Sequence, residues 1–496
     1  MNPSADTNLK PRVLFCPSYL YRYDDKQWKD QKPYPPLGTL IAAAFLRNHD
    51  YPVQLFDTHM ANHPSEINTY LESDTPEFVV IYDDGFNYLT KMCLSAMRQV
   101  AFDIIGYSKK KQATVIVCNS DATDHCDLYL SNGADFVVLG EGELSLLELL
   151  NSITSGDHAI SKIPGIAYKI KDNLVRNISR PIIHDLDQLP DAAWDLADLD
   201  IYKKIWTTAH GYFSLNMATT RGCPFKCNWC AKPIYGNRYN SRSAVRVAKE
   251  LKYLKEKYGA EHIWMADDIF GLNKKWMTEF YAAVVDLGVT IPYKIQSRAD
   301  LLIQENYANQ LKATGCAEVW IGAESGSQKI LDAMDKGITV TQIHKSTQLL
   351  QSKGIRVGYF LQFGYIDENL DDIKSTVKML MNNMPDDIGI SVSYPLPGTL
   401  FYEKVKSQLG PKQNWKDSDD LDMMYHAPFS PAFYKQLHRL VHKLFRLKQG
   451  WLNFLHLVKG KKKLNWNVLK SIASILYYLP AAVADRLKLL RLYTSA

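Results

Sequence analysis

Short apolar segments alternate with helical patterns along much of the chain, and this alternation constrains the fold more than any other feature. In the first part of the chain we expect a helix over residues 37–48 and strands over residues 13–17, 53–57, 78–82, 114–118 and 136–139. Continuous apolar strands separated by helices are typical of a parallel sheet that is buried on both faces. The pattern therefore predicts a Rossmann-like α/β domain at the start of the chain.

The same alternation returns between residues 212 and 399. Helical patterns such as residues 244–258 and 341–353 follow strands expected at residues 213–219, 262–266, 293–296, 318–321, 357–363 and 389–393. These units are too few for the eightfold (β/α) barrel, which usually takes about 250 residues. We therefore predict a partial (β/α)6 barrel as a second α/β domain.

The sequence changes character between and after these two regions. Residues 163–170 and 174–176 suggest a small hairpin, and the acidic stretch 185–200 suggests a linker. From Pro431 onward the pattern is helical, aromatic and basic. The predicted organisation is a Rossmann-like domain (1–150), a linker with a small hairpin (151–205), a partial barrel (206–405) and a helical basic region (406–496).

Size and composition limit the class of protein. The chain has 496 residues, which exceeds the length that a single hydrophobic core usually supports. Its content of 46% hydrophobic and 22% charged residues is ordinary for a soluble globular protein. Its net charge of +5 gives no case for nucleic acid, which requires clustered basic residues. We expect no signal peptide, because residues 1–10 are polar, and no run that reaches the roughly 18 apolar residues of a membrane span. The eight cysteines are then expected to be thiols or metal ligands in the reducing cytoplasm.

Three cysteines lie close together directly after an expected strand: Cys223, Cys227 and Cys230. They can converge on one metal centre only if the backbone wraps around it, and Gly222 and Pro224 supply the turn. Three thiolates leave one iron of a four-iron–four-sulfur cluster open for an exogenous ligand, because a closed cluster takes four. The spacing therefore predicts a [4Fe-4S] cluster with one free iron.

Two other uses of these thiols are weaker. A structural zinc site, as in a zinc-binding interaction protein, would need His210 or Cys316 from elsewhere as its fourth ligand. A redox dithiol would use Cys227 and Cys230 and leave Cys223 idle.

A Cys-x3-Cys-x2-Cys loop after the first strand of a partial barrel resembles the radical S-adenosylmethionine (SAM) superfamily. The resemblance implies that the open iron chelates the amino and carboxylate groups of SAM. It also implies that reductive cleavage yields a 5′-deoxyadenosyl radical, which removes hydrogen from an unactivated carbon, and that a flavodoxin or ferredoxin supplies the electron. Trp229 fits the family's aromatic position before the last cysteine.

Motifs at the ends of the expected barrel strands resemble the sites where this family binds SAM. Asp267 and Asp268 would bind its amino end, and Arg298 would pair with its carboxylate. Glu324 would accept hydrogen bonds from the ribose, and Gly398 lies in a turn that resembles the adenine side. All of them follow strand carboxyl ends, where barrel enzymes build their sites.

The N-terminal domain resembles the cobalamin-binding subgroup of the superfamily. Residues 35–44 and 53–57 resemble its opening strand–helix–strand unit, and residues 133–143 resemble its closing strand and turn. The resemblance implies a groove for cobalamin at the carboxyl edge of the sheet, lined by Leu37, Gly38, Asp57, Ser120, Gly140, Glu141 and Gly142.

Two details of this domain depart from related patterns. Residues 57–62 resemble the Asp-x-His-x-x-Gly motif that binds cobalt through histidine, but they follow the second strand and end in Asn62. We therefore expect His59 to be a loop residue and not a ligand. The subgroup often has a Gly-Gly-x-His turn after its fourth strand, where this chain has residues 118–125. A domain that serves only as a lid is the alternative to cobalamin binding.

Residues 394–446 resemble the anaerobic Mg-protoporphyrin IX monomethyl ester oxidative cyclase branch, which closes the fifth ring of a porphyrin. The resemblance implies cobalamin-assisted radical SAM chemistry on a small, hydrophobic or porphyrin-like substrate. Cobalamin-dependent C-methyl transfer is the alternative reaction, and a cobalamin or cluster sensor without catalysis is a hypothesis of another class. The sequence assigns no acid–base residues.

The basic tail has two interpretations. A helix with lysines and arginines beside Trp451, Phe454 and Leu457 could lie on an anionic membrane surface, which would suit a hydrophobic substrate. A helical cap packed on the barrel would leave the same lysines solvated. The cap is favoured because caps are commoner, so we expect a cytoplasmic protein, with peripheral membrane contact through these helices as the alternative.

Overall fold

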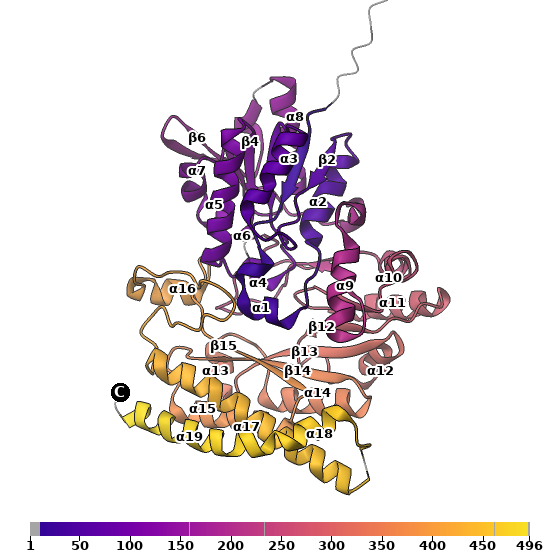
Figure 1. Cartoon of the computed structure of the whole chain (residues 1–496), viewed down its shortest axis with the longest axis vertical. Helices are drawn as coiled ribbons and strands as arrows, with labels where there is room; N and C mark the ends of the chain where they lie inside the picture. The colour runs from indigo at the N-terminus through magenta and orange to yellow at the C-terminus, as the bar shows by residue number, and fades with distance from the viewer. Residues whose placement is uncertain (1–9, 158, 233, 461, 495–496) are drawn as a thin grey trace, which may run out of the picture.

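The computed structural model describes residues 10–157, 159–232, 234–460 and 462–494. The N-terminal domain lies at the top of Figure 1, the barrel strands lie in the middle, and the C-terminal helices cover the bottom. This arrangement confirms the predicted fold class, an α/β chain with a Rossmann-like domain, a partial barrel and a helical C-terminal region.

The N-terminal domain is built on a sheet with the strand order β2-β1-β3-β4-β5-β6-β7. Its parallel strands are β1 (Val13–Cys16), β2 (Val53–Leu55), β3 (Phe78–Tyr82), β4 (Thr114–Cys118) and β5 (Phe136–Val138). Every residue of β1 and β3 is buried. Burial on both faces explains why these strands are apolar throughout and do not alternate with polar residues.

Helices cover both faces of this sheet and bury alternate residues of each strand. Phe15 and Val80 pack into a core with α2 (Leu37–Arg47) and α8 (Glu143–Ser155). Leu14 and Val79 pack into a second core with α3 (Ile67–Ser73), α5 (Ser95–Lys110) and α7 (Cys126–Ser131). The predicted winding of helices on both faces is confirmed.

The predicted hairpin is present and extends the first sheet. Strand β6 (Ile166–Ile170) pairs antiparallel with β5, and β7 (Asn173–Arg176) pairs antiparallel with β6. The N-terminal sheet therefore continues past residue 150, because the edge of β5 offers backbone groups that the hairpin pairs with.

The barrel sheet has the strand order β15-β14-β13-β12-β11-β8, and all neighbours are parallel. Its strands are β8 (Ser214–Met217), β11 (His262–Met265), β12 (Tyr293–Ser297), β13 (Cys316–Glu324), β14 (Arg356–Phe363) and β15 (Asp387–Val392). The helices that follow them are α10 (Ala244–Tyr258), α11 (Lys274–Asp286), α12 (Glu305–Ala313), α14 (Val340–Ser352) and α15 (Leu370–Asn383). Each predicted barrel strand is confirmed.

Local capping signals set where several of these helices begin. Thr339 forms a capping box with Gln342 at the start of α14, and Asn369 forms one with Asp372 at the start of α15. Such side chains satisfy backbone N–H groups that have no partner inside the helix. These starts can therefore be predicted from the sequence within a residue or two.

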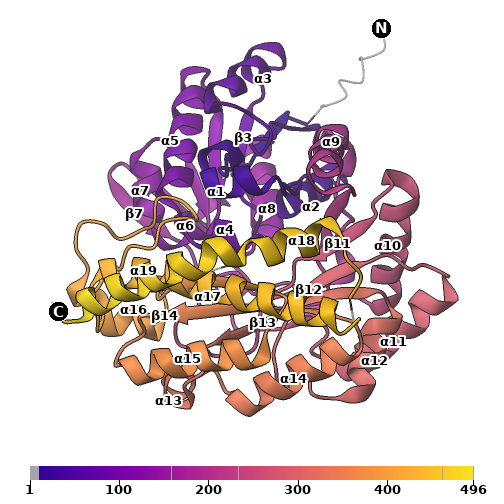
Figure 2. The same cartoon turned by 60° about the horizontal axis from the view of Figure 1, so that its bottom comes forward.

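The C-terminal region is helical, as predicted, and consists of α16 (Leu400–Val405), α17 (Pro431–Val458), α18 (Trp466–Ala473) and α19 (Ile475–Thr494). Helix α17 packs on the barrel, where Arg446 donates to Asp387 at 3.1 Å and Lys448 to the Met381 carbonyl at 2.6 Å. Helix α19 lies along α17 (Figure 2).

One helix of the described chain, Trp466–Tyr493, is long and apolar enough to cross a membrane by length and composition, with a mean hydropathy of 1.3. We expected no membrane span from the sequence, because its longest uncharged apolar stretch, residues 472–484, is shorter than a span and contains Pro480. The helical run found here comprises α18 and α19, with Ser474 between them, and it includes the charged residues Lys470 and Asp485.

Candidate functional site

The loop that carries the three cysteines is held at its base by a short sheet. Strand β9 (Thr220–Arg221) leads into the loop and pairs antiparallel with β10 (Asn240–Ser241) behind it. Gly222 has φ +82°, and a side chain on it would place Cβ 2.4 Å from the Arg238 carbonyl oxygen. Only glycine fits there, so the sequence permits the turn that brings Cys223 back toward the barrel.

The loop is also anchored at its middle, between Cys227 and Trp229. The side-chain amide of Asn228, which is 4% exposed, donates to the Ala333 carbonyl at 2.7 Å and to Asp335 at 2.8 Å. Tyr365 donates its hydroxyl to the Asn228 side-chain oxygen at 2.6 Å. No sequence motif singled out Asn228, because its partners lie more than 100 residues away.

All three cysteines are free thiols, with Cys223 buried and Cys227 and Cys230 half-buried. Burial, followed by the charge of Asp268, raises the pKa of the Cys230 thiol to about 12, and the other two thiols act in the same direction. Within the described residues, no three His, Cys, Asp or Glu side chains form a group that could hold a metal ion. In a four-iron cluster each thiolate binds a different iron, so a ligand set for one ion is not the arrangement it needs.

Asp267 supports the strand end that precedes the loop. One carboxylate oxygen accepts hydrogen bonds from the backbone N–H groups of Thr219 at 2.7 Å and Thr220 at 2.6 Å, and both threonine hydroxyls donate at 2.9 Å. Burial raises the pKa of Asp267 and these hydrogen bonds lower it; burial is the larger effect, so the pKa stands at about 6. Both carboxylate oxygens are thus in use, and the predicted contact of Asp267 with SAM stays a prediction.

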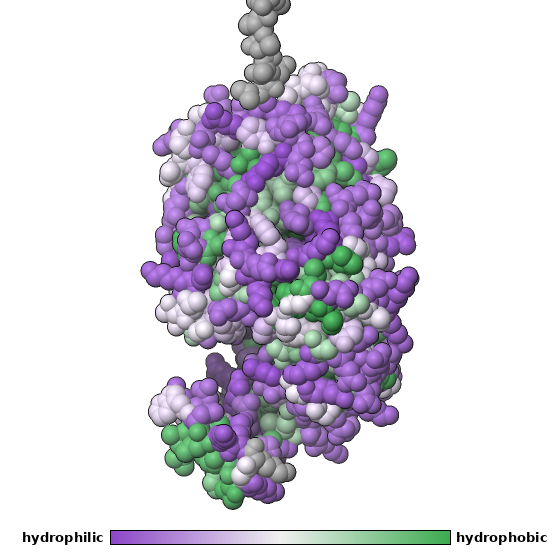
Figure 3. All heavy atoms as spheres, turned by 90° about the vertical axis from the view of Figure 1, so that its right-hand side faces the viewer, coloured by the Kyte–Doolittle hydropathy of each residue, from purple (hydrophilic) through white to green (hydrophobic). Residues whose placement is uncertain are grey.

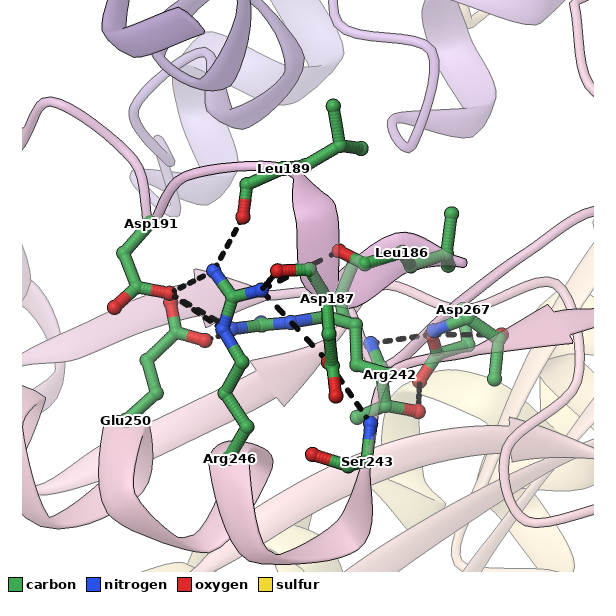
Figure 4. A network of polar contacts seen from close by, with 12 residues as sticks. Leu186, Asp187, Leu189, Asp191, Arg242, Ser243, Arg246, Glu250 and Asp267 are labelled. Atoms are coloured by element: carbon green, nitrogen blue, oxygen red, sulfur yellow. Dashed lines mark hydrogen bonds and ion pairs between the residues drawn. The ribbon is translucent and has the colours of Figure 1, made fainter. Parts of the chain in front are cut away.

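Two arginines hold the linker against the barrel, and one of them also reaches the same strand end (Figure 4). Arg242 donates to the Ala218 carbonyl at 3.1 Å and to Asp191 at 2.9 Å, and it also pairs with Glu250. Arg246 donates to Asp191 at 2.7 Å. The start of α10 and the linker therefore brace the residues that lead into the cysteine loop.

Asp268, next in the chain, faces the N-terminal domain instead. Lys91, at the end of the short helix α4 (Tyr88–Lys91), donates to Asp268 at 2.6 Å. Burial lowers the pKa of Lys91, but the charge and hydrogen bond of Asp268 and the nearby Cys230 outweigh it, so the pKa stands above its ordinary value. The sequence offered no signal for Lys91, whose partner is 177 residues away.

Arg298 lies against the first half of the cysteine loop. Its guanidinium is 3.6 Å from the centre of the Phe225 ring, and it donates to Asp300 at 3.0 Å and to the Gly337 carbonyl at 3.2 Å. The side chain is 5% exposed. The structure thus places Arg298 beside the loop, as the predicted role requires, while the pairing with a SAM carboxylate stays a prediction.

Glu324 and Trp229 lie on either side of one lysine. Lys336 donates to Glu324 at 2.7 Å, and its ammonium lies 5.8 Å from the centre of a Trp229 ring. Glu324 ends β13 with φ +53°, which a non-glycine residue rarely adopts. Gly398, with φ +75°, lies farther along in the turn before α16 and has open space beside it.

The two domains meet through a buried ion-pair group. Arg221, two residues before Cys223, donates to Glu141 and Glu143 at 2.6 Å each, and the three side chains are at most 5% exposed. Glu141 also accepts a hydrogen bond from the Ile183 backbone N–H at 2.5 Å. The turn after β5 and the entrance of the cysteine loop are therefore joined.

The predicted cobalamin contacts follow the carboxyl ends of the strands in the first sheet. The Gly38 N–H donates to Asp84 at 3.1 Å, Tyr202 donates to Asp57 at 2.8 Å, and Gly142 lies against Cys118 and Tyr82. Leu37 is buried, Ser120 begins α6 (Ser120–Asp124), and Gly140 has φ +76°. The structure brings these positions to one edge, and the contacts with cobalamin stay predictions.

His59 is a loop residue, as predicted, but it is buried. Its Nδ1 donates to the Tyr34 carbonyl at 2.8 Å, and its ring packs edge-on against Tyr19. Its Nε2 has no hydrogen-bond partner in the described structure.

Buried polar atoms without partners mark where further groups would fit. In the barrel these are Nε1 of Trp229 in the cysteine loop and Oγ of Ser297 at the end of β12. In the N-terminal domain they include Nε2 of His59 and Oδ2 of Asp124. An unpartnered buried polar atom costs free energy, so a bound group that supplies hydrogen bonds would be stabilised there. The residues of the site therefore fit a cluster with a polar ligand beside the loop and a second polar group at the first sheet.

Comparison with known proteins agrees with this geometry. Residues 217–380 match the model of the Radical SAM superfamily. The match begins at the end of β8 and includes the cysteine loop and the ends of β11, β12, β13 and β14.

Two curated relatives cover about half of the chain. An uncharacterized methyltransferase of Pyrococcus horikoshii is 32% identical over 291 residues, which is 58% of this chain and 62% of the relative. The anaerobic magnesium-protoporphyrin IX monomethyl ester cyclase of Rubrivivax gelatinosus is 28% identical over 277 residues, 55% of this chain and 49% of the relative. The chain thus spans less than two thirds of the length of either.

The whole fold has a counterpart among solved structures. The cobalamin-dependent SAM radical enzyme OxsB, solved with aqua-cobalamin and SAM bound, superposes with a TM-score of 0.72 at 17% identity, over 95% of this chain and 71% of OxsB. The likeness shows that the two proteins share the fold of an N-terminal α/β domain and a partial barrel.

Proposed function

We propose, from the premise that residues 217–380 form a radical SAM domain, that this chain is a cobalamin-assisted radical SAM enzyme. Cys223, Cys227 and Cys230 would hold a [4Fe-4S] cluster, and the carboxyl ends of both sheets would hold SAM and cobalamin. When bound, these groups supply an electron, a SAM-derived radical and a cobalt centre for the functionalisation of an unactivated carbon. One observation carries the proposal: a glycine-dependent loop with three free thiols enters the barrel between the two domains.

The chain's own residues would position these groups. Asp267 fixes the strand end that leads into the loop and Asn228 fixes the middle of the loop, which sets the spacing of the thiols. Arg298 and Glu324 lie beside the loop with one cationic and one anionic group, the charges that suit the carboxylate and the ribose hydroxyls of SAM. The N-terminal domain covers this face of the barrel and would exclude water from it.

The end reaction is either oxidative cyclisation or methyl transfer. The cyclase relative supports a porphyrin-like substrate, and the methyltransferase relative supports transfer of a methyl group to carbon. In both cases we expect a small hydrophobic substrate and a flavodoxin or ferredoxin as the electron donor in the reducing cytoplasm. Mass spectrometry of cell extracts with and without the gene separates the two reactions, since one product gains a methyl group and the other an oxidised ring.

The central test uses anaerobically reconstituted protein with SAM and dithionite. We expect 5′-deoxyadenosine from the native protein and none from the Cys227→Ala variant. The variant should also lack most of the iron and acid-labile sulfide that the native protein binds. Cys316→Ala is the matched control. That thiol is buried at the first residue of β13, whereas Glu324 near the cysteine loop is the last, so the substitution should leave the cluster and the product unchanged. Native protein that binds the cluster but releases no 5′-deoxyadenosine would support the sensor hypothesis instead.

A further inference from the structure

The C-terminal helices present large apolar side chains to solvent. The exposed fractions of Leu476, Val458 and Trp466 are 83%, 69% and 66%. We use the name C-terminal apolar face for the exposed residues Val458, Trp466, Leu476, Tyr477, Val483 and Leu487. Figure 3 shows hydrophobic residues gathered on the lobe at the lower end of the molecule. Exposed apolar area of this density usually marks an interaction site.

The opposite side of the same helices is firmly docked on α17. Lys443 donates to Asp485 at 2.5 Å, and Gln436 donates to the Asp485 carbonyl at 3.3 Å. Gly450 of α17 lies so close to α18 and α19 that a Cβ would come within 2.6 Å of the Ser471 carbonyl oxygen. The apolar face is therefore held outward by specific contacts, since only 11% of the most apolar window of Trp466–Tyr493 is buried.

The segment that carries most of this face is strongly basic and contains almost no acidic residues. Asp485 is the only acidic residue between positions 459 and 496, and it is paired with Lys443. The same segment of the sequence contains the eight basic residues Lys459, Lys461, Lys462, Lys463, Lys470, Arg486, Lys488 and Arg491. Apolar residues rimmed by lysine and arginine match a surface that is anionic outside and apolar beneath.

We propose that the C-terminal apolar face docks on an anionic lipid membrane, with α18 and α19 lying in the plane of the interface. Docking of a second copy of the chain on this face would bring two basic segments together, and their like charges would repel each other. A membrane-crossing helix would carry Lys470, Asp485 and Arg486 into the hydrocarbon and break the contact with Lys443. Docking needs neither the cluster nor cobalamin, so this inference and the proposed function fail or succeed independently.

The test is flotation of the full-length protein with vesicles of phosphatidylcholine alone or mixed with phosphatidylglycerol. We expect binding to the mixed vesicles that weakens as salt rises. The variant L476E/L487E should bind at least tenfold more weakly, because the apolar contribution is lost. The variant K462E/K463E should lose about fivefold or more for each lysine replaced.

Matched controls separate the face from general surface effects. Ile178, 76% exposed on the N-terminal domain, and Lys275, whose side chain is 86% exposed on α11, have similar exposure elsewhere. I178E and K275E should bind like the native protein. Absence of binding to anionic vesicles, or equal binding by L476E/L487E, would overturn the proposal. Resistance to carbonate extraction would overturn it in favour of a spanning helix, and a dimer in light scattering that L476E abolishes would overturn it in favour of a second copy.

Discussion

Arg221 of the barrel donates a hydrogen bond at 2.6 Å to Glu143 of the N-terminal domain, where neither side chain is more than 4% exposed. Arg221 lies two residues before the first cysteine of the loop, and Glu143 begins α8. The charged contact between the domains therefore lies at the entrance of the candidate cluster site. Because Arg221 leads directly into the cysteine loop, the position of the loop depends on the position of the N-terminal domain.

Replacement of Arg221 by methionine should destabilise the protein by about 3–5 kcal/mol. The change leaves Glu141 and Glu143 buried without their countercharge, and two adjacent buried carboxylates repel. Urea unfolding of the native and R221M proteins measures the difference. The triple variant R221M/E141Q/E143Q removes the unpaired charges and should recover much of the loss; a triple variant as unstable as R221M would contradict this account.

Asp267→Ala should lower both stability and iron content. Alanine has no oxygen to accept from the backbone N–H groups of Thr219 and Thr220, which Asp267 now satisfies, and an unsatisfied buried donor costs about 1–3 kcal/mol. The loop would lose its support, so we expect fewer irons per chain after reconstitution. Asp286→Ala is the control, because Asp286 is an exposed residue at the end of α11 and makes none of these bonds; equal iron loss in both variants would show that the threonine contacts are unimportant.

Two glycines with opposite surroundings should respond oppositely to alanine. A Cβ on Gly142 would lie 2.5 Å from Cys118 Sγ and 2.8 Å from the Tyr82 ring, so Gly142→Ala overpacks the domain edge and should cost about 1–3 kcal/mol. Gly106, inside α5, has nothing near its Cβ position, and Gly106→Ala should gain up to about 1 kcal/mol. Thermal unfolding midpoints compare them, and a tolerated Gly142→Ala would mean that this edge can open.

His262 should make the barrel less stable in mild acid. Burial, followed by the charge of Lys294, lowers the pKa of His262 from 6.5 to about 3. Above pH 6.5 the ring is neutral in both states, so its contribution is complete there. Below pH 6.5 the unfolded chain binds a proton that the folded chain does not, and stability falls until pH 3. At pH 5 we expect a loss of about 2 kcal/mol.

Urea midpoints at pH 7 and pH 5 measure this loss. His262→Asn keeps a polar partner for Ser214, which now contacts His262 Nδ1 at 2.8 Å, and removes the titrating ring. The variant should lose less stability between the two pH values than the native protein. An identical loss in both would assign the pH dependence to other groups.

The sequence by itself determined the fold class, the barrel strands and the cysteine loop. Apolar strands of this kind are specified by burial on both faces, and the three thiols are specified by a spacing within one loop. Gly222 belongs to the same group, because the need for a positive φ acts on the residue itself. All of these features can be recognised from the residue types within one short segment, without knowledge of which segments pack together.

Only the tertiary structure decided which side chains support that loop and what lies beside it. Lys91 and Asp268 become neighbours through the packing of the two domains, and Asn228 and Tyr365 through packing within the barrel, and no local pattern encodes either pairing. The exposure of Leu476 and Leu487 was also decided by the tertiary structure, because the sequence pattern of an apolar helical face is the same whether or not a neighbour covers it. Long-range packing, and not composition, distributes burial and charge around a site whose local chemistry the sequence already contains.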